Sequence, residues 1–170
     1  MSAQTRYGYS TPIGAPGGIA DIAPYAIDTF ANEEANGKMK FGFGVVAGSK
    51  PGKNVKLPTS ASKSVDFAGI VTNNRTAEYD MEGAIFLRKD KALGVMRYGR
   101  IYARVPAGLT VSPNDSLYLI ASGDNAGCFT NVASGNLAIK GRFLTTADTT
   151  TLVAEVELFN QAQENASDKT

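Results

Sequence analysis

The side chains that most often perform enzyme chemistry are nearly missing from this chain. Its 170 residues include no histidine and a single cysteine, Cys128. Histidine is the only side chain that titrates near neutral pH without perturbation, so histidine-based triads and histidine-ligated zinc are excluded. One cysteine cannot form an intrachain disulfide, and Cys128 is interpreted as a small buried residue. We therefore expect no catalytic residue, no metal ligands and no cofactor.

Three weaker patterns have simpler explanations than catalysis. Ser60-Ala61-Ser62-Lys63 holds the residue types of a Ser–Lys nucleophile, but it lies in a polar stretch where a lysine is normally solvated. The acidic residues, which could pair in a glycosidase, fall mostly in turns. Residues 42–47 match a dinucleotide-binding fingerprint, which must open a helix; Gly48–Gly52 follow, include Pro51 and cannot form one. The sequence therefore predicts a protein that is not an enzyme and has no small-molecule substrate.

The most informative local pattern lies in residues 97–105. Side chains alternate between the two faces of a strand, so Gly99, Ile101, Ala103 and Val105 share a face that suits a core. The opposite face would carry Tyr98, Arg100, Tyr102 and Arg104. Tyr and Arg are enriched in the hot spots of protein interfaces, which is the interpretation we favour. An ordinary solvated face and a single-stranded nucleic-acid platform, where rings stack on bases, stay open as alternatives.

The elements that would position this face are short strands. The segments are rich in Val, Ile, Phe and Tyr, are separated by Gly, Pro, Asn and Asp turns, and cover residues 38–46, 65–71, 84–88, 93–96, 99–105, 116–121, 137–144 and 152–158. The fourth and fifth could be one bent strand. No window has a helical period, since the best candidate, residues 20–31, is interrupted by Pro24. We predict an all-β fold, a compact β-barrel or sandwich (β-tulip-like) with an extended N-terminal arm.

The arm is predicted from a stretch rich in Gly and Pro over residues 7–24. Such a stretch resists regular structure, yet its apolar side chains would not suit a disordered tail. The segment is expected to become ordered either against its own domain or against a neighbour. We assign residues 1–37 to the arm, 38–160 to the β domain and 161–170 to a polar C-terminal tail. The expected anchors of the arm are Tyr7, Tyr9, Ile13 and Ile19.

Charge is distributed unevenly along the chain. Residues 38–104 carry 13 Lys and Arg against five acids, whereas both flanks are acidic, and the total is +1. Residues 50–64 form a long polar connection that includes Lys53 and Lys56, and connections of this length are often functional or mobile. The asymmetry can orient a protein on a partner; alternatively, the signs interleave once the chain folds. The chain lacks the overall excess of basic residues that would indicate binding to nucleic acid. No segment has the length and hydrophobicity of a targeting or membrane-spanning sequence.

The order of these features resembles a known family. The likeness is carried by the arm of residues 7–21, by Lys40–Val46, Phe67–Val71 and Val95–Ile101, by Leu117–Leu119 and Gly127–Thr130, and by the closing strand of residues 153–159. In this order the segments resemble the Gp24-like structural cement, or head-decoration, proteins of tailed bacteriophages. The likeness covers nearly the whole chain, although each segment alone is a common strand or turn pattern.

The resemblance implies a non-enzymatic virion protein that is made in the cytoplasm of the bacterial host. It implies binding to the outside of the icosahedral head, where the protein would clamp neighbouring major capsid subunits together and stabilise the capsid. The expected partners are the major capsid protein and further copies in a homotrimer, with no nucleic acid and no membrane. Other virion roles, as a head–tail connector or fibre base, and a nucleic-acid-binding β-barrel remain alternatives. The residues expected at protein interfaces are Tyr7, Tyr9, Ile13, Ile19, Lys53, Lys56, Tyr98, Arg100, Tyr102 and Arg104.

Overall fold

Apart from one short 3-10 turn, the regular elements in the described part of the chain are all strands. The computed structural model describes residues 14–73, 78–79 and 85–160. Its elements are β1 (Ala26–Asn32), β2 (Gly44–Ala47), β3 (Asn54–Lys56), the 3-10 turn η1 (Ser64–Asp66), β4 (Phe67–Val71), β5 (Glu78–Tyr79), β6 (Ile85–Phe86), β7 (Ala92–Arg104), β8 (Ser116–Leu119), β9 (Phe129–Thr130), β10 (Leu137–Phe143) and β11 (Val153–Leu158). The predicted all-β class is confirmed.

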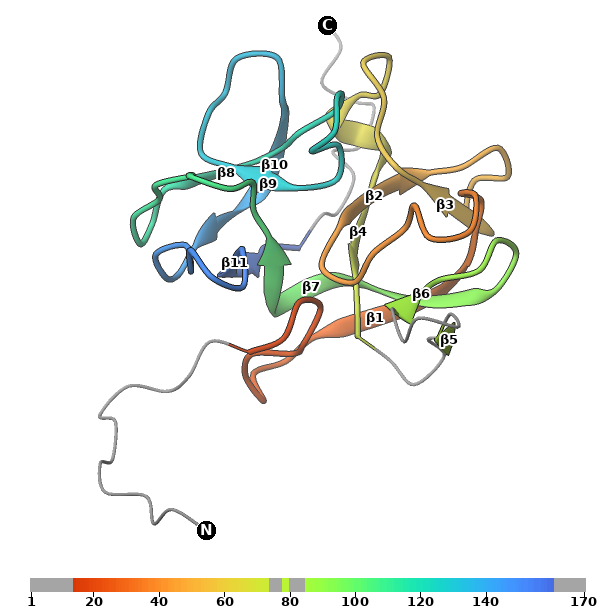
Figure 1. The fold of residues 1–170 in the computed structure, drawn as a ribbon, viewed down its shortest axis with the longest axis horizontal. Coiled ribbons are helices and arrows are strands. Elements are labelled where there is room, and N and C mark those ends of the chain that lie inside the picture. The colour runs from red at the N-terminus through yellow and green to blue at the C-terminus, as the bar shows by residue number, and fades with distance from the viewer. Residues whose placement is uncertain (1–13, 74–77, 80–84, 161–170) are drawn as a thin grey trace, which may run out of the picture.

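Strand β7 joins two sheets. The strand order is β1-β3-β2-β4-β7-β11-β10-β8-β9, and an additional β1–β7 pairing closes the first five strands into a barrel. β7 has 13 residues, long enough to pair with β1 and β4 in its first half and with β11 in its second. In Figure 1 the barrel lies on one side, β8 to β11 lie on the other, and β7 passes along both.

Two hydrophobic cores lie on opposite faces of the strands β2, β4 and β7. Val45, Val71 and Val95 point into the barrel core, together with Met39, Phe41, Val55, Leu87 and Leu93. Their neighbours Val46, Ile70 and Met96 point the other way, into the core shared with β8 to β11. Adjacent side chains of a strand point to opposite faces, so each of these neighbouring pairs is divided between the two cores. This explains why β2 and β4 are buried on both faces.

Residues 92–104 form one strand, β7, which agrees with the bent-strand alternative for the fourth and fifth predicted strands. Elsewhere the structure differs from the predicted strands. The predicted strand over 38–46 begins only at Gly44, because Lys40–Phe43 form a turn in which the Phe43 N–H donates to the Lys40 carbonyl. Residues 50–64, expected as an irregular connection, contain β3, which pairs with both β2 and β1.

Strand β1 lies within the residues that the sequence assigned to the arm. It pairs with β7 in antiparallel fashion from Ala26 to Ala31, and with β3 in parallel fashion at its end. The alternation of residue types is weak here, because Thr29 is exposed like Ile27, and Asp28 lies on the same face as Phe30. The division into an arm, a β domain and a tail stays a prediction, with β1 as a strand of the barrel.

One glycine is required by the tight approach of β4 to β7. Gly69 has φ of +144° and lies beside an irregularity in the β2–β4 register. A Cβ atom at this position would meet the Met96 carbonyl oxygen and the Val95 side chain. Both atoms belong to β7, whose position is fixed by its partners in the two sheets.

Replacing Gly69 with alanine should therefore cost much more stability than the same change in an open turn. We expect Gly69→Ala to lower the free energy of unfolding by about 3 kcal/mol or more. Gly108→Ala is the matched control, since Gly108 also has a positive φ, of +76°, but has nothing within 4 Å of the added methyl group. It should cost about 1 kcal/mol. Urea unfolding at pH 7 measures both, and equal losses would contradict the close approach.

Candidate protein–protein interface

The outer face of β7 carries the four residues that the sequence singled out. Ile101, Ala103 and Val105 are buried in the core, as expected, and Tyr98, Arg100, Tyr102 and Arg104 lie on the other face. Of these four residues Tyr98 is the most exposed, with 39% of its surface accessible to solvent. The other three are partly covered by residues of the same chain.

Residues 14–21, which we call the arm root, cover this face. The Gly17 N–H donates to the Tyr102 carbonyl at 2.7 Å, the Tyr102 N–H donates to the Gly18 carbonyl at 3.0 Å, and the Ala20 N–H donates to the Arg100 carbonyl at 3.1 Å. An antiparallel bridge joins Ile19 to Ile101. The arm root thus adds to the edge of β7 and leads directly into β1 (Figure 1). Of the two alternatives for the arm, residues 17–20 are ordered against their own domain.

Arg100 connects the arm root to the second sheet. Its guanidinium donates to Asp21 at 2.9 Å and to Glu157 of β11 at 3.2 Å. Arg142 of β10 donates to the same Glu157 at 2.8 Å. Burial of Glu157 opposes its ionisation, but the hydrogen bonds and charges of Arg142 and Arg100 outweigh burial and hold the pKa of Glu157 below its usual value. The network fastens the arm root, β7, β11 and β10 together.

Tyr102 and Arg104 are also in contact with their own chain. The Tyr102 ring lies so close to Gly14 that a Cβ there would overlap it. The Arg104 Nε donates to the Phe41 carbonyl at 2.8 Å, and the guanidinium lies 6.0 Å from the centre of the Phe43 ring. These contacts leave no row of exposed alternating rings and cations of the kind that stacks on nucleic-acid bases.

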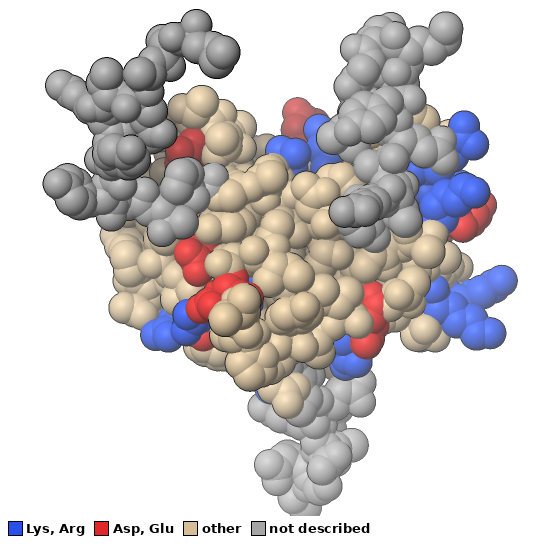
Figure 2. Space-filling view, turned by 90° about the horizontal axis from the view of Figure 1, so that it is seen from below, with Lys and Arg blue, Asp and Glu red and all other residues tan. Residues whose placement is uncertain are grey.

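Exposed apolar side chains gather instead around the arm root and β1. Ile22 is 99% exposed, and Ile19, Tyr25, Ile27 and Tyr98 are between 37% and 49% exposed. Ile19 and Ile27 line one groove of about 450 Å³, and Tyr25 contacts β7 at Gly99, next to Tyr98. We call these five residues the apolar surface. Figure 2, which views the molecule from the side of β1, shows a broad uncharged surface at its centre.

A basic edge lies beside this surface. The turn of residues 50–53 and the turn of residues 88–91 meet at the end of β1, where Ala31 donates to the Lys53 carbonyl and Asn32 donates to the Lys91 carbonyl, each at 2.9 Å. In Figure 2 most of the basic side chains, in blue, gather at the right of the molecule. The members of the basic edge are Lys50, Lys53, Lys56, Lys89 and Lys91.

Glu33 lies among these lysines. The Ser49 N–H donates to it at 2.7 Å, and this bond, aided by Lys56 and Lys89, lowers the pKa of Glu33. Elsewhere the flanking acids do neutralise the basic middle of the sequence, since Arg97 pairs with Asp28 at 2.9 Å. Ion pairs of this kind show that the signs interleave on part of the surface, whereas the basic edge keeps an excess of positive charge.

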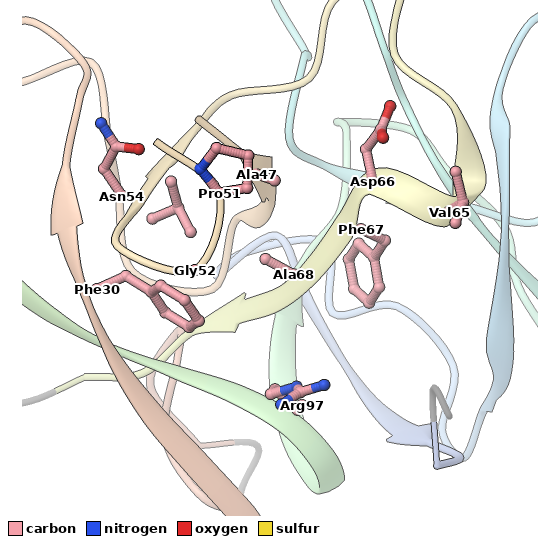
Figure 3. Close-up of a pocket in the computed structure, with 11 residues that line it drawn as sticks. Phe30, Ala47, Pro51, Gly52, Asn54, Val65, Asp66, Phe67, Ala68 and Arg97 are labelled. Carbon is pink, nitrogen blue, oxygen red and sulfur yellow. The ribbon is translucent and has the colours of Figure 1, made fainter. Parts of the chain in front are cut away.

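A separate hollow of about 300 Å³ lies between the β2–β3 turn and β4 (Figure 3). Phe30, Pro51 and Phe67 line it, and its two charged residues are already engaged. Arg97 pairs with Asp28, and Asp66 accepts a hydrogen bond from the Lys63 N–H at 2.9 Å. The hollow therefore offers no unused charged group to a ligand.

In residues 14–73, 78–79 and 85–160, no group of three or more Cys, Asp or Glu side chains is placed to hold a metal ion. No helix in the same ranges combines the length and the apolar character needed to cross a membrane. Cys128 is buried, and burial raises the pKa of its thiol.

The predicted interface residues fall into four groups. Tyr7, Tyr9 and Ile13 lie outside the described residues. Ile19 and Tyr98 lie together on the apolar surface, and Lys53 and Lys56 lie on the basic edge. Arg100, Tyr102 and Arg104 are engaged with their own chain. Sequence reasoning did not select Tyr25 and Ile27, although apolar residues at i and i+2 beside the arm were a usable signal of a strand face.

Two glutamates on the same face of β11 should respond oppositely to neutralisation. Glu157 is ionised and paired, whereas burial raises the pKa of Glu155 and no hydrogen bond to its carboxylate compensates among the described residues. At pH 7 we expect Glu157→Gln to lower the free energy of unfolding by about 1 kcal/mol, and Glu155→Gln to leave it unchanged or raise it. Urea unfolding measures both.

The pH dependence provides the control for this pair. A lowered pKa gives stability that is present above the unfolded-state pKa and is lost as the pH falls. The deficit of Glu157→Gln should therefore shrink as the pH falls from 7 toward 3. The effect of Glu155→Gln should shrink over the same range, since a raised pKa penalises only the ionised form. A pH-independent deficit for Glu157→Gln would contradict the ion-pair network.

Comparisons with known proteins agree with this geometry. No curated protein matches the chain in sequence. Seven chains of solved structures match it; one, from a structure described as the capsid of Myoviridae phage XM1, has a TM-score of 0.68 at 18% identity, over 94% of this chain and 98% of that chain. This likeness shows a shared fold. The family model described as "Structural cement protein (E217 gp24/Pam3 gp6)" matches residues 3–159, and the chain therefore belongs to the family of phage structural cement proteins.

Proposed function

We propose that the protein binds the outside of the icosahedral phage head and clamps neighbouring major capsid subunits together. Membership of the cement family makes it a structural component of the virion, and the capsid structure that shares its fold supports an association with capsid proteins. The observation that carries the proposal is the apolar surface, which places five large exposed side chains around the arm root. Synthesis in the cytoplasm of the bacterial host belongs to the same proposal.

The apolar surface has the character of a protein contact. Single exposed apolar residues are common, but a contiguous exposed patch marks an interaction site. Five of the eight large exposed apolar side chains of the described residues lie here, and the others, Val65, Val132 and Phe159, lie elsewhere. Ile22 at 99% exposure makes almost no contact with its own chain, so its burial against a capsid subunit would add apolar contact without loss of internal packing.

The basic edge would contribute mainly to approach and orientation. Its lysines lie at the rim of the apolar surface, where exposed charges add little affinity but accelerate association with a complementary partner. We propose that they face an acidic region of the shell. Raised salt would then slow association more than it speeds dissociation, since screening acts on the long-range attraction.

The arm is proposed to extend the contact from the point where the arm root leaves β7. Extended segments bind exposed strand edges through main-chain hydrogen bonds, with side chains in alternate pockets. Tyr7, Tyr9 and Ile13 are the proposed anchors of this part. We also propose that the protein acts as a homotrimer, in which three linked contacts raise the avidity by about 10²–10⁴ over one contact. Binding to the intact lattice alone would then stabilise it by mass action.

Head binding should depend on the apolar surface and not on exposed apolar residues in general. We expect Ile22→Ser to weaken binding to empty heads at least tenfold, as removal of a buried contact residue does, without loss of folding stability. Val65→Ser is the matched control, because Val65 is 68% exposed and lies outside the apolar surface. Co-sedimentation with heads and densitometry of the bound protein give affinity and copy number.

The copy number, the comparison of the two variants and a separate oligonucleotide-binding assay decide between the functions. Hundreds of wild-type copies per head support a cement role, and about a dozen or fewer indicate a connector or fibre base. If both variants weaken head binding equally, the apolar surface is not the contact with the capsid. Saturable binding of the wild-type protein to a single-stranded oligonucleotide, weakening steeply with salt, would favour the nucleic-acid alternative.

The oligomeric state is tested separately. We expect light scattering to give a mass of three chains, each of 17.9 kDa, over a range of concentrations. The measurement needs no heads, so it is independent of the binding assay. A mass that stays at one chain up to the highest concentration contradicts a trimer in solution.

A further inference from the structure

A pocket of about 380 Å³ lies between the arm root and the turn of residues 39–41. Met39, Phe41 and Leu87 provide apolar walls, and all three also belong to the barrel core. Asn73 lines both this pocket and the groove on the apolar surface. The pocket therefore neighbours the surface proposed to contact the capsid.

Among the described residues, two cations and no carboxylate line the pocket. Arg104 and Lys40 are the charged lining residues. Arg104 has five N–H donors on its side chain, and within the described residues only Nε has an acceptor, the Phe41 carbonyl. No fully buried polar side-chain atom in those ranges lacks a partner, so the unused donors of Arg104 open into the pocket.

Partial burial without an anionic partner is energetically unfavourable for an arginine side chain. Burial lowers the pKa of Arg104, and the neighbouring group that acts in the other direction is the thiol of Cys128. That thiol is neutral at pH 7, because burial raises its pKa. The other arginines whose ion pairs are described, Arg97, Arg100 and Arg142, each have a carboxylate at 2.8–3.2 Å. Arg104 stands apart from them as a partly buried cation with no anionic partner in the described chain.

We propose that this pocket receives an Asp or Glu carboxylate on an extended segment of the capsid partner. A guanidinium binds a carboxylate through two parallel hydrogen bonds, and Lys40 adds a second positive charge. The apolar walls suit a neighbouring hydrophobic side chain of that segment, whereas a phosphate group would need polar donors on most sides. The identity of the partner rests on the proposed function; the affinity of the pocket for a carboxylate does not.

The pocket is tested first without heads, on the full chain. Sodium 3-phenylpropanoate is titrated against isotope-labelled protein, with 3-phenylpropanamide and inorganic phosphate as parallel probes. We expect the Arg104 Hε resonance to shift saturably with the carboxylate, with an apparent Kd of the order of millimolar, and not with the amide. An absent response, an equal response to the amide, or a response to phosphate alone overturns the carboxylate site.

The partner is tested by head binding of two variants. Lys40→Gln and Arg104→Gln should each weaken binding at least tenfold, while Lys38→Gln, which removes an exposed lysine two residues from Lys40 but outside the pocket, should not. Among the described residues Lys40→Gln removes no side-chain hydrogen bond or ion pair, so it remains informative if Arg104→Gln fails to fold. Unchanged binding by Lys40→Gln overturns the capsid carboxylate. Failure of the wild-type protein to bind heads would overturn the proposed function instead, and the titration would still decide on the pocket.

Discussion

Both cores and the arm root depend on the pairing of a single strand, β7. Its first half closes the barrel against β1 and β4, and its second half pairs with β11 on one edge and with residues 17–20 on the other. Because side chains alternate along it, Val95 belongs to one core and Met96 to the other. A change in the register of β7 would move apolar side chains out of both cores at once. This constraint explains the tight fit of Gly69 against Met96.

The same strand determines which surface is free for a partner. Main-chain hydrogen bonds to the arm root occupy one edge of β7. On its outer face, Arg100 is engaged in ion pairs with Asp21 and Glu157. The exposed apolar residues therefore lie beyond it, on the arm root and β1. The arm leaves the domain at one border of this surface, and the pocket containing Arg104 lies next to it. A cement protein needs a stable body with an external contact surface, and this arrangement separates the two.

Much of the fold was predictable from alternation and turn residues. The class, most strands and the buried face of residues 99–105 follow from apolar residues at every second position with Gly, Pro and Asn between. Strands β1 and β3 were not predictable in this way, because their pairing depends on segments distant in sequence. Ala31 bonds to Lys53, and Asn32 bonds to Lys91. For the interface, the residue types at Tyr98 to Arg104 suggested a contact face. Only the tertiary structure shows that Asp21, Gly14 and Phe41 of the same chain satisfy most of that face.

A cryo-electron microscopy reconstruction of heads decorated with this protein tests the central claim most directly. The account predicts density for the β domain on the outer surface of the shell, with Ile19, Ile22, Tyr25 and Ile27 turned toward capsid subunits and buried between more than one of them. Density in which these side chains face solvent, with the β8–β11 sheet against the shell, would contradict it.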